Sequence, residues 1–155
     1  MVKNRLPFPA LFIALFLFAF GCGGASADND KAEGIKIRVT IAELQFSATL
    51  VDNATSRAFI ARMPLTLPME PLYGREMCYR FPEPLPAEEA RRSGYEVGDI
   101  AYWTPRNSFV IFYGQNGEVI DNLQKVGRFD SDIEMLAVFG DREAVEISFD
   151  MEPLD

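Results

Sequence analysis

Two neighbouring stretches of the chain alternate between apolar and polar residues. In residues 35–41 (IKIRVTI) every second side chain is isoleucine or valine, and residues 44–50 (LQFSATL) repeat the pattern with leucine, phenylalanine and alanine. A period of two places the apolar side chains on one face of a β-strand. The two stretches therefore predict a pair of strands joined as a hairpin, although the turn between them has no glycine.

Further strands are indicated by short runs of aromatic and β-branched residues. Residues 99–103 and 109–113 are the richest in such side chains, and the short loop 104–107 between them predicts a second hairpin. Weaker strand patterns occupy residues 65–67, 76–81, 126–129 and 144–149. Helices are expected only at about 53–62, where Asp52 and Asn53 offer a cap and Pro64 ends the pattern, and at 133–139.

The number and spacing of these elements bound the fold. About eight short strands with frequent turn signals favour a sandwich or a closed barrel, and a closed barrel also leaves no free sheet edges. Pro82, Pro84 and Pro86 predict a loop, because proline lacks the amide hydrogen that a central strand needs. We therefore expect one mainly β domain over residues 35–155.

The first 21 residues predict a signal peptide. Lys3 and Arg5 precede the wholly apolar residues 11–20 (LFIALFLFAF). At roughly 1.5 Å per residue, such a helix is too short to cross a bilayer core of about 30 Å.

Two cleavage sites compete after this segment. Residues 19–22 (AFGC) resemble a bacterial lipobox, which would leave Cys22 to carry a lipid, whereas residues 25–27 (ASA) fit an ordinary signal peptidase. We favour the lipobox, with residues 22–34 as a flexible tether between the membrane and the domain. Either site places the mature chain outside the cytoplasm, in the cell envelope or as a soluble exported protein.

Composition excludes several classes of function. The chain of 155 residues has 15 Lys and Arg against 23 Asp and Glu, a formal charge of -8, which argues against binding nucleic acid. It has no histidine, which excludes His-dependent nucleophiles and His-ligated metal sites. Cys78 would be the one cysteine of the mature domain, and we interpret it as a packed core residue rather than a nucleophile. No metal or cofactor is predicted.

Several motifs together resemble the small bacterial cyclophilin-like proteins. They are residues 49–57 (TLVDNATSR), 63–67 (MPLTL), 98–102 (GDIAY) and 125–131 (KVGRFDS). The resemblance extends over residues 35–150, which is nearly all of the mature chain. It implies a closed eight-stranded cyclophilin-like β-barrel capped by two short helices.

The same resemblance bears on activity. Cyclophilins that isomerise prolyl bonds use an arginine beside an apolar pocket, supported by a glutamine and by a tryptophan or histidine. Through residues 78–81 (CYRF), Arg80 matches the arginine, but Tyr79 stands at the position of a histidine in that motif. The glutamine-containing segment of the family has no counterpart here. Retaining the barrel without these groups favours binding over catalysis.

Two functions remain open from the sequence. The first is a lipid-anchored binding or accessory module that takes a small-molecule or peptide ligand, with Arg80, Tyr102, Trp103 and Phe112 as candidate contacts. The second is an extracytoplasmic peptidyl-prolyl isomerase with a reduced site, in which Arg80 contacts the twisted amide. Each candidate also has a structural interpretation. Arg80 fits an exposed cation paired with surplus acids, and the aromatic side chains fit barrel packing.

Overall fold

The structure is a computed structural model that describes residues 34–153. The predicted signal peptide, Cys22 and nearly all of the predicted tether lie outside the described residues. Among residues 34–153, no helix is both long enough and apolar enough to span a membrane.

The described residues form nine strands, one α-helix and two 3-10 helices. In chain order the elements are β1 (Ile35–Ile41), β2 (Leu44–Leu50), α1 (Ala54–Ile60), β3 (Leu65–Leu72), β4 (Glu76–Arg80), β5 (Arg91–Ser93), β6 (Asp99–Trp103), η1 (Thr104–Arg106), β7 (Ser108–Phe112), β8 (Ile120–Phe129), η2 (Glu134–Phe139) and β9 (Val145–Met151). The mainly β fold class predicted from the sequence is confirmed.

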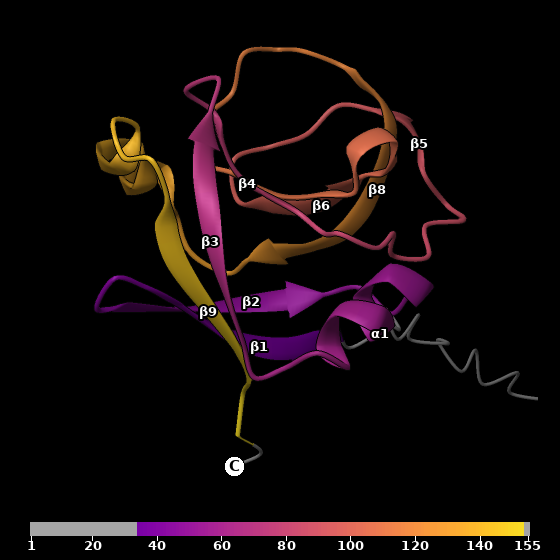
Figure 1. Ribbon diagram of the computed structural model, residues 1–155, viewed down its shortest axis with the longest axis horizontal. Helices are drawn as coiled ribbons and strands as arrows, with labels where there is room; N and C mark the ends of the chain where they lie inside the picture. The colour runs from indigo at the N-terminus through magenta and orange to yellow at the C-terminus, as the bar shows by residue number, and fades with distance from the viewer. Residues whose placement is uncertain (1–33, 154–155) are drawn as a thin grey trace, which may run out of the picture. The chain divides into compact units, whose positions relative to one another are not determined.

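Eight of the strands form a closed antiparallel ring. Its order is β1, β2, β8, β6, β7, β4, β3 and β9, with β9 pairing back to β1. Figure 1 shows β3 and β9 side by side although they lie far apart in the sequence, which agrees with their five-pair ladder. The ring closes where residues 48–50 of β2 meet residues 127–129 of β8. β5 pairs with β8 outside the ring.

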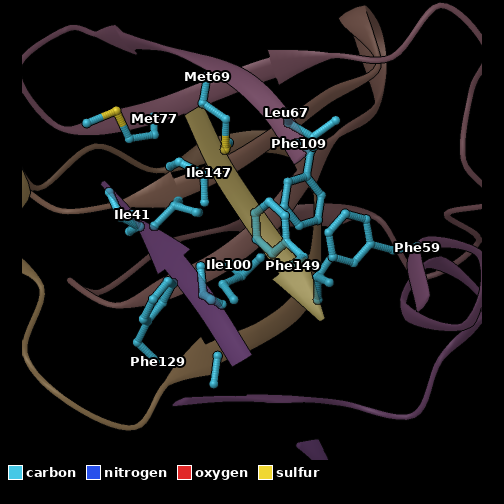
Figure 2. Packing of buried hydrophobic residues seen from close by; sticks show 14 of the residues in the cluster. Ile41, Phe59, Leu67, Met69, Met77, Ile100, Phe109, Phe129, Ile147 and Phe149 are labelled. Carbon is cyan, nitrogen blue, oxygen red and sulfur yellow. The ribbon is translucent and has the colours of Figure 1, made fainter. Parts of the chain in front are cut away.

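The interior of the barrel is filled by the alternating apolar residues that predicted the strands. Phe59 of α1 stacks on Phe109 of β7 with ring centroids 4.2 Å apart, and it meets Phe149 of β9 edge-on at 5.1 Å. Figure 2 shows these three rings packed together, with Ile147 and Met69 among the aliphatic side chains. Stacked and edge-on aromatic pairs add about 0.5–1.5 kcal/mol each beyond the area they bury.

Both predicted helices are present, but they differ in type, and the predicted loop 104–107 contains the third helical turn, η1. α1 begins at the expected cap, where the Asn53 side chain accepts the backbone amide of Ser56 at 2.9 Å. η2 is a 3-10 helix rather than an α-helix. Leu136 is its buried side chain, and Ile133, which precedes the helix by one residue, is also buried in the core. The two are three residues apart, which matches the three residues per turn of a 3-10 helix.

The structure also corrects some strand boundaries. β5 was not predicted, because its three residues, Arg91–Ser93, are polar and show no alternation. β8 begins at Ile120 rather than at residue 126, since the exposed Asp121 and Asn122 interrupt its apolar pattern. These two strands pair with each other, so the two errors concern one region of the molecule.

Candidate functional site

A groove lies on the outer face of β4 and β7. Three cross-strand pairs of these strands form its floor, namely Glu76 with Phe112, Cys78 with Val110, and Arg80 with Ser108. Their neighbours along each strand, such as Met77 and Ile111, pack in the barrel interior. The alternation of each strand therefore separates a barrel face from a groove face.

The groove has the size of a small-molecule site. Its volume is about 390 Å³, within the range of roughly 300–1,000 Å³ that is typical of ligand pockets. Trp103 of β6 and Ile120 and Leu123 of β8 contribute further apolar side chains to its lining. Together with the central pair Cys78 and Val110, they give the groove an apolar middle.

One end of the groove contains a buried charge cluster. The Arg75 guanidinium donates to Glu76 at 3.0 Å and also to Glu118, and the side chains of Arg75 and Glu76 are only 11% and 8% exposed. Burial raises the pKa of the Glu76 carboxyl, although the neighbouring Arg75 acts in the opposite direction. This end carries two carboxylates against one guanidinium.

Aromatic rings support the charge cluster. Tyr95 stacks on Phe112 with centroids 3.9 Å apart, and the Arg75 guanidinium lies 5.4 Å from the Tyr95 ring and 5.3 Å from the Tyr73 ring. Cation–π contacts of this kind orient a guanidinium as well as stabilise it. The arrangement fixes Arg75 toward its two carboxylates and leaves it unavailable to a ligand.

The other end of the groove presents two arginines to solvent. Arg80 of β4 approaches a single carboxylate, that of Glu70, at 3.9 Å, which is at the limit of an ion pair. Arg106, at the end of η1, has no carboxylate within 4.0 Å in the part of the chain that the structure describes. Both side chains line the groove. This end of the groove therefore combines one weakly paired arginine with one that has no carboxylate partner among the described residues.

Three of the four predicted ligand contacts meet in this groove. Arg80, Trp103 and Phe112 all line it. Trp103 is the single tryptophan of the chain, and its Nε1 donates to the carbonyl of Asp121 at 2.9 Å, which holds the indole against β8.

Tyr102 lies on the opposite face of β6. It is fully buried in the barrel interior, where its hydroxyl accepts the amide of Leu85 at 3.0 Å and donates to the Asn107 side chain at 3.2 Å. The strand alternation that puts Trp103 in the groove therefore directs Tyr102 away from it. Tyr102 is a packing residue of the core.

Cys78 is buried in the floor of the groove, in line with its interpretation as a packed residue. Burial raises the pKa of its thiol, so the reactive thiolate is disfavoured at neutral pH.

Sequence reasoning did not identify the charged residues at the ends of the groove, which are Arg75, Glu76, Arg106 and Glu118. The period of two in β4 puts Glu76 on the same face as Arg80, so it could have been found. Arg75 and Glu118 lie in separate loops that meet only in the folded protein, so no local sequence pattern predicts their ion pair.

A second cavity of about 380 Å³ lies next to β5 and β8. Its polar side chains are largely engaged within the protein. The Asn53 side chain donates to the carbonyl of Lys125, and the Gln124 side chain accepts the amide of Glu89 and donates to the Lys125 carbonyl. We therefore take the groove as the candidate site. Within residues 34–153 no group of three acidic or cysteine side chains is arranged to hold a metal ion.

Comparisons with known proteins agree with this architecture. The solution structure of the hypothetical protein AF2241 from Archaeoglobus fulgidus is similar to the chain, with a TM-score of 0.61 and 17% sequence identity over 80% of this chain and 99% of that chain. At this identity the likeness concerns the fold alone. A comparison with curated proteins found no match. The sequence profile of the cyclophilin-like family matches residues 39–150, which include the whole groove floor, and the chain therefore belongs to the cyclophilin-like family.

Proposed function

We propose that the protein is a non-catalytic binding or accessory module of the bacterial cell envelope, anchored to a membrane through acylated Cys22. Its groove takes a small-molecule or peptide ligand. The observation that supports this most is the groove itself, in which an apolar middle lies between two charged ends on an outer face of the barrel. Concave apolar sites with a few polar groups are the usual form of ligand pockets.

The chemistry around Arg80 favours binding over catalysis. Tyr79, at the position of a histidine in the resembled motif, packs edge-on against Phe81 at 5.0 Å and belongs to the barrel side of β4. The chain has no histidine, and the buried Arg75 is held by two carboxylates. Arg80 thus has neither a histidine nor a glutamine beside it among the residues that line the groove.

Ligand binding is tested by a thermal-shift screen of the mature protein with proline-containing peptides and small metabolites. A ligand at 100 times its dissociation constant stabilises the folded state by about 2.7 kcal/mol, which raises the melting temperature by several degrees. We expect the shift to be reduced in Trp103→Leu and retained in Met135→Leu, a matched change at an exposed residue of η2 outside the groove. A ligand that stabilises both variants equally would place the binding site elsewhere.

A peptidyl-prolyl isomerase with a reduced site is the second candidate, favoured by one observation. Arg80 is only weakly paired with Glu70 and lies beside an apolar floor, where a guanidinium could contact a twisted amide. A protease-coupled isomerisation assay of the mature protein decides between the two candidates. We expect no acceleration, and an acceleration that Arg80→Ala abolishes would establish the enzyme instead.

The membrane anchor is a separate proposal with its own test. Cleavage before Cys22 leaves an acylated cysteine at the mature N-terminus, whereas cleavage after Ala27 leaves a free Asp28. Mass spectrometry of the protein purified from cells distinguishes the two masses. Finding Asp28 would make the protein a soluble exported one, with the groove unchanged.

A further inference from the structure

We infer that the groove recognises a small amphiphilic monoanion, whose carboxylate is bound by Arg80 and Arg106 and whose apolar part rests on the floor of the groove. This inference rests on the proposed binding function and specifies its ligand class. The matching chemistry is that of an N-acylated apolar amino acid, or of the free C-terminal residue of a peptide with an apolar side chain.

The carboxylate subsite follows from the two arginines. Arg80 and Arg106 both line the same end of the groove. Arg80 meets only the Glu70 carboxylate, at 3.9 Å, and Arg106 has no carboxylate within 4.0 Å among the described residues. Guanidinium groups bind carboxylates through paired, charge-assisted hydrogen bonds. A ligand carboxylate would supply a closer partner than Glu70 for Arg80 and the first partner for Arg106.

The apolar subsite follows from the cross-strand pairing. Next to Arg80 and Ser108, the floor continues with Cys78 and Val110, and the indole of Trp103 lines the same groove. A side chain attached near the carboxylate would therefore lie on apolar atoms. Burying an aliphatic side chain there favours ligands with a leucine-like or larger group.

The opposite end of the groove limits the ligand to one negative charge. Glu76 and Glu118 share a single guanidinium, that of Arg75, so this end repels a second anion. The distance also limits ligand length. Glu76 and Arg80 are four residues apart on β4, so their backbones are about 13 Å apart at roughly 3.3 Å per residue. This is an upper limit for the two charged ends, because the Arg80 charge still acts on the Glu76 carboxyl, in the direction that lowers its pKa. This length accommodates about three extended residues of a peptide.

The single tryptophan provides the measurement. Because Trp103 lines the groove and is the chain's only tryptophan, its fluorescence reports occupancy of this site. The experiment uses the mature protein reconstituted in phosphatidylcholine vesicles and titrates it with N-acetyl-leucine or with N-acetyl-leucine amide. Neither probe absorbs where tryptophan is excited. We expect the acid to bind about tenfold more tightly than the amide, because only the acid makes charge-assisted hydrogen bonds.

Substitutions test which residues carry the preference. Arg80→Gln and Arg106→Gln are exposed changes that keep hydrogen-bonding capacity while removing charge. We expect the double variant to bind the acid and the amide with equal affinity, because both charges that favour the acid are gone. Arg142→Gln is the matched control, since Arg142 is an exposed arginine outside the groove, and it should keep the full preference.

Each outcome decides the inference. Equal affinity for acid and amide in the original protein would overturn anion recognition and leave a binding groove in place. No fluorescence change with either probe at millimolar concentration would also overturn this inference. The proposed binding function would then be tested separately, by the thermal-shift screen. Adding N-acetyl-Ala-Ala-Leu and its amide separates the two sources of the carboxylate. Tighter binding of the tripeptide acid assigns a peptide C-terminus, and tighter binding of N-acetyl-leucine assigns a free metabolite.

Discussion

Two buried tyrosines show how one hydroxyl group changes the energetics of the barrel. The hydroxyl of Tyr102 has two partners, the amide of Leu85 and the side chain of Asn107. The hydroxyl of Tyr113 is equally buried but has no hydrogen-bond partner among the described residues. Its burial, together with the nearby Glu76 carboxyl, raises the pKa of Tyr113, so the hydroxyl stays neutral.

This contrast predicts that replacing each tyrosine with phenylalanine has opposite effects on stability. Tyr113→Phe removes a buried, unpaired polar atom, and we expect the free energy of unfolding to rise by about 1 kcal/mol. Tyr102→Phe leaves the Leu85 amide without its partner, and we expect a loss of about 1–2 kcal/mol. Urea denaturation followed by circular dichroism measures both. A loss of stability in Tyr113→Phe would show that the hydroxyl is satisfied in solution.

For single residues, the sequence showed which side chains of a strand lie on the same face of the sheet. Period-two alternation places Tyr102 and Trp103 on opposite faces of one strand, and it places Val110 and Phe112 on one face of the next strand and Phe109 on the other. It could not say which face is the barrel interior, because both faces of these strands are apolar. That depends on which strands pair, so Tyr102 remained a site candidate until the structure placed it.

At the scale of the elements, the pairing of β2 with β8 closes the ring, and this pairing depends on a glycine. A Cβ atom on Gly127 would lie 2.5 Å from the carbonyl oxygen of Thr49 and 2.6 Å from a side-chain carbon of Leu50. Real Cβ atoms do not approach other atoms so closely. Strand β8 can therefore reach β2 only because residue 127 has no side chain.

Gly127→Ala should weaken this closure. We expect it to lower the free energy of unfolding by about 1–3 kcal/mol, the usual cost of overpacking a tightly packed site. Gly94→Ala is the matched control, because a Cβ there meets no atom within 4 Å, and it should be close to neutral. Guanidinium denaturation of the two variants checks the difference. Equal stability of both would mean that the β2 and β8 pairing adjusts without cost.

Elements with strong alternation were predicted well, and elements defined by their neighbours were not. β1 and β2 were predicted with their observed bounds, since each has one face in the core and one outside it. β5 has three residues without any pattern and exists as a strand because β8 runs beside it. The start of β8 was missed because the exposed Asp121 and Asn122 interrupt its apolar pattern. Pairing between distant segments, rather than local preference, determines such elements.

For the molecule as a whole, two carboxylates give the stability opposite dependences on pH. Burial tends to raise the pKa of Asp130, but hydrogen bonds from Lys36 at 2.8 Å and Thr49 at 2.7 Å lower it overall from its ordinary 3.8. For Glu76, burial outweighs the attraction of Arg75 and raises the pKa above its ordinary 4.5. A lowered pKa stabilises the fold at higher pH, and a raised pKa stabilises it at lower pH.

Asp130→Asn and Glu76→Gln should separate these two effects. Asp130 contributes stability above about pH 4 that is lost as the pH falls through its lowered pKa, so Asp130→Asn should be less stable than the original protein at pH 7 and equal to it in strong acid. Glu76→Gln should gain stability relative to the original protein as the pH rises from 4 to 7. Denaturation curves between pH 2 and 8 measure both. Parallel pH profiles for all three proteins would contradict the prediction.

Strand β5, which lies outside the eight-stranded ring, affects how the protein behaves at high concentration. In the sheet of residues 34–153, β5 is the terminal strand, so its outer side carries the sheet's free edge. It has only three residues, two of them the exposed arginines Arg91 and Arg92, and its pairing to β8 is irregular. A short, charged and distorted edge is a poor template for strand addition by another chain. Molecules at high concentration should therefore resist aggregation through edge-to-edge pairing of their β-sheets.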